Sequence, residues 1–181
     1  MNFVESIRAE YERYKALAEG AIAQLRDDEL SAVPPGGGNS IATIAWHVGG
    51  NLRSRFTNFL TEDGEKPWRV REEEFQARAV TQVELLEHWR RGWTALLDTM
   101  AELRDDDLAR TVTIRQRPLT VVEALHRSLS HASYHVGQIV YAAKAIKGAE
   151  WRYLSIPPGQ SDAYNAAPAF EKPHEVIARL K

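Results

Sequence analysis

The chain has 181 residues and a formal net charge of -2 at pH 7, with 23 Lys and Arg against 25 Asp and Glu. This balance lacks the basic excess that non-specific nucleic-acid binding requires, so we expect no nucleic-acid partner. The absence of cysteine excludes disulfides, thiolate metal ligands and a cysteine nucleophile, and it suits a reducing cytoplasm.

The first predicted helix spans about residues 2–30. Asn2 is a suitable N-cap, and apolar residues recur at helical spacing from Phe3 to Leu25. The charged first turn is unlike a signal peptide, and no run approaches the roughly 18 apolar residues of a membrane span. We therefore expect a cytoplasmic protein with no membrane partner. The prolines and glycines of residues 34–38 form a connector, because they lack the lysine and the spacing of a phosphate-binding loop.

The second predicted helix spans about residues 39–60, with Asn39 or Ser40 as its cap. His47 and Asn51 lie one turn apart, to the side of its apolar stripe. Two adjacent glycines follow His47, and each weakens a helix by about 1 kcal/mol relative to alanine. Their presence indicates that another helix or a ligand approaches closely at this level. Taken alone, His47 is better explained as a solvent-facing or interface histidine.

A long polar connection, residues 61–79, separates the second helix from the third. Its length permits a crossover, so these two helices need not be antiparallel neighbours. The third predicted helix spans about residues 80–104, and we interpret His88 within it as a surface or rim residue. Its apolar side is predicted to comprise Val83, Leu86, Trp93, Leu97 and Met100.

The fourth predicted helix, residues 120–147, carries the candidate chemistry. Thr120 and Glu123 have the spacing of a capping box. His131 and His135 are four residues apart, so both project from one face and could bind a single metal ion. Imidazole binds zinc, nickel, iron and copper, so the pair does not identify the metal. On its own, the pair fits packed histidines at the edge of a core better than it fits a metal site.

Residues 148–181 form a C-terminal arm. Four prolines between residues 157 and 173 exclude one long helix there. The arm has apolar anchors between Trp151 and Ile156, so we expect it to pack on the helices. Covering the mouth of a site with Ser161 and Asn165 is an equal alternative.

One histidine on the second helix and two on the fourth resemble the DinB/YfiT-like superfamily of metal-dependent enzymes. More narrowly, SHASYHVGQIVYAAK followed by EWRYLSIPPGQSDAYN resembles an uncharacterised bacterial branch, a domain of unknown function. The specific part is H-x-x-x-H-x-G-Q-I, and the resemblance covers nearly the whole chain. It implies an all-α fold: a single-domain four-helix bundle over residues 1–181, in up-down-down-up order with a long crossover between its second and third helices. It also implies a homodimer.

The resemblance implies that His47, His131 and His135 bind a divalent metal ion, with zinc or nickel favoured and iron or manganese as further candidates. Three imidazoles leave a coordination position open, as catalytic sites do. Relatives act as thiol-dependent transferases or isomerases, or are proposed hydrolases. We therefore expect a small-molecule substrate, such as a low-molecular-weight thiol, and an ion that activates the thiol or water.

The supporting residues are less specified, and the sequence identifies no catalytic residue. Asn51 and Gln138 are candidates to orient the imidazoles or to contact substrate, with a plain helix-surface role equally open. No glutamate near His47 is evident as a general base, which favours thiolate chemistry over peptide hydrolysis. Two rival functions stay open: a non-catalytic metal-binding or stress-associated bundle that acts through a partner, and a structural helical dimer without metal.

Overall fold

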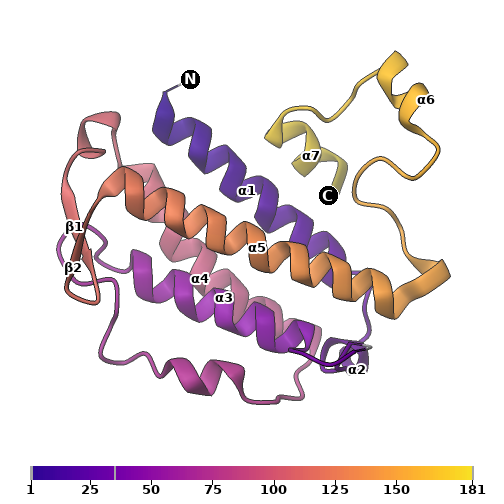
Figure 1. Cartoon of the computed structure of the whole chain (residues 1–181), viewed down its shortest axis with the longest axis horizontal. Helices are drawn as coiled ribbons and strands as arrows, with labels where there is room; N and C mark the ends of the chain where they lie inside the picture. The colour runs from indigo at the N-terminus through magenta and orange to yellow at the C-terminus, as the bar shows by residue number, and fades with distance from the viewer. Residues whose placement is uncertain (1, 35, 181) are drawn as a thin grey trace.

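The computed structural model describes residues 2–34 and 36–180, and this part of the chain is mostly helical (Figure 1). The long helices are α1 (Phe3–Ile22), α3 (Ile41–Phe56), α4 (Gln82–Glu102) and α5 (Val121–Lys147). The short ones are α2 (Asp27–Leu30), α6 (Ser161–Ala166) and α7 (Pro173–Leu180), with 3₁₀ turns η1 (Arg71–Phe75), η2 (Asp105–Asp107) and η3 (Gly148–Glu150). Strands β1 (Thr111–Ile114) and β2 (Arg117–Thr120) pair antiparallel as a hairpin. Among the described helices, none is long and apolar enough to cross a membrane.

The predicted caps begin the helices where the sequence places them. The side chains of Asn2, Ser40 and Thr120 each accept a hydrogen bond from the backbone N–H three residues further on. Glu123 completes the predicted capping box at the start of α5. Replacing such a cap with alanine costs about 1 kcal/mol, so each residue fixes a helix start independently of the core.

Two helices are shorter than predicted. The expectation of one helix to Leu30 is wrong, because α1 ends at Ile22 and a new helix, α2, begins after Arg26. The Arg26 backbone N–H donates to Glu29 Oε2 at 2.8 Å, and three acidic residues in this first turn favour a separate N-terminus. The second helix ends at Phe56, not near residue 60, because Asn58 adopts a left-handed conformation with φ of 50°.

Helices α3 and α4 pack closely and run in the same direction. Three contacts along the two helices pair Trp46 with His88, Gly49 with Gly92, and the Phe56 carbonyl with the Thr99 hydroxyl, which donates to it. Residue numbers rise together in both helices from one contact to the next, so the helices are parallel. A β-carbon added to Gly92 would lie 2.3 Å from the Gly49 carbonyl oxygen, so this contact requires glycine. The predicted close approach at the glycine pair is confirmed.

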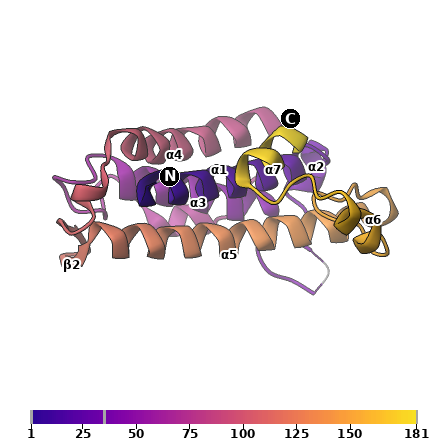
Figure 2. The ribbon, with the colours of Figure 1, turned by 90° about the horizontal axis from the view of Figure 1, so that it is seen from above.

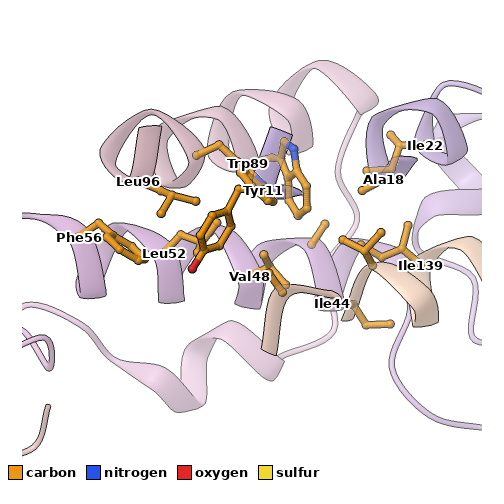
Figure 3. Close-up of a cluster of buried hydrophobic side chains, with 14 of the residues drawn as sticks. Tyr11, Ala18, Ile22, Ile44, Val48, Leu52, Phe56, Trp89, Leu96 and Ile139 are labelled. Atoms are coloured by element: carbon orange, nitrogen blue, oxygen red, sulfur yellow. The ribbon is translucent and has the colours of Figure 1, made fainter. Parts of the chain in front are cut away.

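The core lies between the four long helices and is rich in aromatic residues (Figure 3). Tyr11 is fully buried among them and donates its hydroxyl to the Leu125 carbonyl at 2.8 Å, which joins α1 to α5. The predicted face of α4 is partly wrong, because Val83 is 77% exposed. The apolar residues that α4 buries are Leu85, Trp89, Trp93, Leu96 and Met100.

One carboxylate fastens the crossover to the β1–β2 hairpin. Asp63 accepts hydrogen bonds from the backbone N–H groups of Arg115 and Gln116, at 2.8 and 2.7 Å. Burial raises the pKa of Asp63, but backbone hydrogen bonds outweigh it and hold that pKa at about 2. The crossover and the hairpin thus form one end of the molecule, beside the start of α5.

The C-terminal arm packs against α1 through α7, as Figures 1 and 2 show. The side chain of Leu180 lies against Gly20 of α1, and Val176 is buried. The arm therefore contacts the helices on a face formed by α1. Ser161 and Asn165 are exposed on α6.

Candidate metal centre

The three predicted histidines come together between α3 and α5. His47 projects from α3 and is 4% exposed, whereas His131 and His135 project from α5 and are partly buried. One ring nitrogen from each lies within 4.8 Å of the other two, so the group could hold a metal ion. The interpretation of His47 as a solvent-facing residue is therefore wrong. His47 lies on the side of α3 that packs against α5, so α5 covers its ring.

The ring geometry fits a small divalent ion. His47 Nε2 and His131 Nε2 are 3.2 Å apart. Two nitrogens bound to a tetrahedral zinc ion at about 2.0–2.1 Å would be about 3.3 Å apart. The ring of His135 lies 5.0 Å from that of His47 and 4.6 Å from that of His131, between centroids.

Two of the imidazoles are held from behind by polar side chains. Glu74 Oε2 lies 2.8 Å from His47 Nδ1, and Gln138 Oε1 lies 2.7 Å from His135 Nδ1. An acceptor at Nδ1 favours the tautomer whose Nε2 carries the lone pair, and for His47 this is the nitrogen that faces His131. Residues in this position behind a ligand histidine orient the ring and strengthen metal binding.

Glu74 is the residue that the sequence failed to connect with the site. It lies in η1 within the crossover, and its carboxylate also accepts two hydrogen bonds from Arg69, each 2.8 Å long. Burial raises the pKa of Glu74, but the hydrogen bonds from Arg69 and His47 outweigh it and lower that pKa, so the group is ionised. The sequence did not indicate that a glutamate lies near His47, because the crossover folds back over α3 to bring Glu74 there.

The glycine pair after His47 explains how the crossover approaches so closely. A β-carbon on Gly50 would lie 2.3 Å from Glu74 Oε1, so any larger residue would require the carboxylate to shift. Gly50 thus makes room for the carboxylate, while Gly49 faces α4. Phe75, next to Glu74, places its ring 4.6 Å from that of His47. The glycine pair was the one sequence signal that could have indicated Glu74.

The local environment keeps two of the imidazoles neutral. Burial, with the nearby charges of the other histidines and of two arginines, lowers the pKa of His131 to about 3. Burial also lowers the pKa of His135, although its hydrogen bond with Gln138 opposes this. Neutral imidazole is the form that binds metal, so both rings are ready to bind an ion at neutral pH.

A cavity of about 200 Å³ borders His47 and His131, and Asn51 is among the residues that line it. His88 lies outside this group. Its ring stacks on Trp46 at 3.8 Å between centroids, and its Nε2 donates to the Trp46 carbonyl at 2.9 Å. His88 is thus a partly buried packing residue between α3 and α4, which fits the predicted rim position better than an open surface.

Comparisons with known proteins give a family and a fold. A family model described as a protein of unknown function, DUF1572, matches residues 1–160. The structure is similar to the crystal structure of a conserved protein from Enterococcus faecalis, with 16% sequence identity and a TM-score of 0.63. The similarity covers 82% of this chain and 99% of the other, and at this identity it shows a shared fold alone. No curated protein matches the chain.

Proposed function

The chain belongs to the DUF1572 family of proteins of unknown function, and we propose that it is a divalent-metal-dependent enzyme. In this proposal His47, His131 and His135 hold the ion, with zinc or nickel favoured and iron or manganese as further candidates. The observation that carries the proposal is the convergence of three ring nitrogens, two of them from rings held at Nδ1 by Glu74 and Gln138.

Three protein ligands are typical of catalytic sites, whereas structural zinc sites are usually closed by four. The chemistry that a divalent ion supplies in such a site is a lowered pKa for a water or thiol in its open position. The adjoining cavity gives a small molecule access to this position, because His47 and His131 form part of its wall.

The carboxylate of Glu74 supports thiol activation over general-base hydrolysis. Both of its oxygens accept hydrogen bonds from Arg69, and it contacts the Nδ1 side of His47, away from the other rings. It therefore orients an imidazole and is poorly placed to take a proton from water. The described residues that line the cavity include no aspartate or glutamate. We accordingly favour transfer of a low-molecular-weight thiol, with hydrolysis as the second reaction class.

We also infer kinship with the DinB/YfiT-like superfamily and its up-down-down-up four-helix bundle, with residues 1–181 as one domain. The same-direction packing of α3 and α4, together with the long crossover between them, supports this arrangement. The packing of α7 on α1 supports the inclusion of the arm in that domain. A homodimer, a cytoplasmic location and a small thiol partner stay predictions.

Metal analysis tests the proposal directly. Protein purified without a histidine tag should contain about one equivalent of a divalent metal by elemental mass spectrometry. His135→Ala should lose it, while His126→Ala, an exposed histidine on the same helix, should retain it. Full metal content in His135→Ala would contradict the ligand assignment.

A second assay separates an enzyme from a non-catalytic metal binder. The loaded protein is screened for conjugation of bacterial thiols to electrophiles and for hydrolysis of simple esters and amides. Activity that His135→Ala loses and His126→Ala keeps would support the enzyme. Silence in both panels, with metal bound, would favour the binder.

A further inference from the structure

The cavity beside the histidines is lined largely by positive charge. Its lining includes five guanidinium groups, and among the described lining residues there is no carboxylate. They come from α3, the crossover, the hairpin and α5: Arg55, Arg69, Arg71, Arg115 and Arg127. Because these segments are distant in the sequence, their arginines meet only in the folded protein.

Carboxylates behind the lining compensate part of this charge. Glu65 pairs with Arg55 at 3.0 Å and with Arg115 at 2.9 Å, and Glu74 pairs with Arg69 at 2.8 Å. Burial raises the pKa of Glu65, but the three neighbouring arginines outweigh it and lower that pKa. Two carboxylates thus face three guanidinium groups, which leaves this part of the wall positive.

The remaining two arginines are free to meet a ligand. The partner of Arg71 is Glu72, which is 83% exposed, and an exposed pair of this kind contributes little to stability. Arg127 is exposed on α5 and forms no ion pair with any residue in 2–34 or 36–180. A ligand in the cavity would therefore displace little when it contacts these two side chains.

Arg69 has a buried N–H donor that lacks a hydrogen-bond acceptor among the described residues. Its side chain is 2% exposed, and its Nη1 is buried without a hydrogen-bond acceptor among the described residues. The Glu65 oxygen on that side is 3.6 Å away, which is beyond hydrogen-bond length. A buried donor without an acceptor is unfavourable, and an acceptor in the cavity would relieve this.

We infer that the substrate of this site carries an anionic group, a carboxylate or a phosphate, that binds to Arg69, Arg71 and Arg127 beside the metal ion. This inference rests on the proposed function, since it concerns the substrate of the same site. Guanidinium groups suit both anions, because their paired N–H donors match two oxygens of either group. A cavity of about 200 Å³ is small, which favours a compact acid or the charged end of a longer molecule.

Anion binding to the full-length protein tests the inference. The probes are inorganic phosphate and succinate, titrated by isothermal calorimetry at a fixed ionic strength set with sodium chloride. Each titration uses metal-loaded protein and protein stripped with a chelator. The variants are Arg127→Gln and Arg71→Gln. Arg90→Gln is the matched control, because it removes one exposed positive charge from a different groove, on α4.

We expect at least one probe to bind wild type and Arg90→Gln equally well, and Arg127→Gln to bind it about tenfold more weakly, as expected for the loss of one charge-assisted hydrogen bond. Arg71→Gln should weaken binding in the same direction. Phosphate-only binding would assign a phosphate, and succinate-only binding a carboxylate. The inference is overturned if neither probe binds, or if both variants bind as tightly as Arg90→Gln.

The two protein forms separate this inference from the proposed function. Protein that contains no metal as purified and takes none up, but binds an anion that the arginine variants bind more weakly, would reject the metal enzyme and support the anion site. Protein that binds a metal ion at the three histidines, but binds neither probe in the loaded or the stripped form, would reject the anion site alone.

Discussion

Replacing Glu74 with glutamine tests how far metal binding depends on a residue that never touches the ion. Glu74 is 8% exposed and contacts both His47 and Arg69. A glutamine has one acceptor oxygen, which in the place of Oε2 can accept from His47 and from Arg69 Nη2, but its amide N–H₂ then faces the Arg69 Nε–H donor. The neutral amide supports the His47 tautomer more weakly than the carboxylate does, and the charge of Arg69 loses its main partner.

The magnitudes follow from the contacts. Two opposite charges about 4 Å apart at an effective dielectric constant of about 20 interact by about 4 kcal/mol. Arg69 keeps one distant partner, Glu65 at 3.6 Å. We therefore expect Glu74→Gln to lower the free energy of unfolding by about 3 kcal/mol, near the lower end for breaking a buried pair. Loss of the support behind His47 should weaken metal binding about 10–100-fold.

Two assays measure these effects separately. Urea unfolding of metal-free protein gives the stability change, and competition with a coloured chelator gives the metal affinity. Glu72→Gln is the control, because Glu72 lies in the same turn but is 83% exposed, and its unfolding free energy should change by less than about 0.5 kcal/mol. Glu74→Gln protein that binds metal as tightly as wild type would refute the role assigned to Glu74, whatever its stability.

Three further predictions concern the same region. Gly50→Ala places a methyl group 2.3 Å from Glu74 Oε1 and should weaken metal binding about tenfold, whereas Gly137→Ala on α5, with open space around it, should stabilise the protein by about 0.5–1 kcal/mol. Metal at a hundredfold excess over its Kd should stabilise the protein by about 2.7 kcal/mol, measured as a higher Tm that a chelator reverses. In metal-free protein, the pKa of His131 is about 3 in the folded state and about 6.5 in the unfolded state. The free energy of unfolding should therefore fall by about 1 kcal/mol per pH unit as the pH drops from about 6.5 towards 3. The variant His131→Asn should lack this contribution to the fall.

Each of these three predictions has an outcome that would contradict it. Equal metal affinity in the two glycine variants would show that the close approach at Gly50 has no influence on the site. A Tm that is indifferent to metal and chelator would contradict an ion bound only to the folded state. A pH slope that is unchanged in His131→Asn would mean that other groups account for the whole loss of stability.

The helix starts were predictable because their signals are local. Asn2, Ser40 and Thr120 cap helices with their own side chains, so a few residues of sequence contain the whole interaction. The buried face of α4 was not predictable in this way. Adjacent leucines occur at 85–86 and at 96–97, and periodicity does not decide which member of each pair faces the core until α3 is packed against the helix.

The residues of the site also differ in whether a local sequence signal could predict them. Histidines four residues apart on one helix share a face whatever the tertiary fold, so His131 and His135 could be paired from the sequence. His47 joined them through a family resemblance, and the structure places its ring against theirs. Glu74 and the arginines could not be placed, because the crossover has no periodicity from which its path over α3 could be read. Only the glycine pair indicated that something approached there.

Asp63 gives the cavity an unusual tolerance of acid. The wall of the cavity draws Arg69 and Arg71 from the crossover and Arg115 from the hairpin, and Asp63 joins these two segments through backbone hydrogen bonds. With a pKa of about 2, this carboxylate stays charged as the pH falls from 7 to about 4. Mild acidification therefore leaves the link between the crossover and the hairpin intact, and the arginine wall keeps its shape.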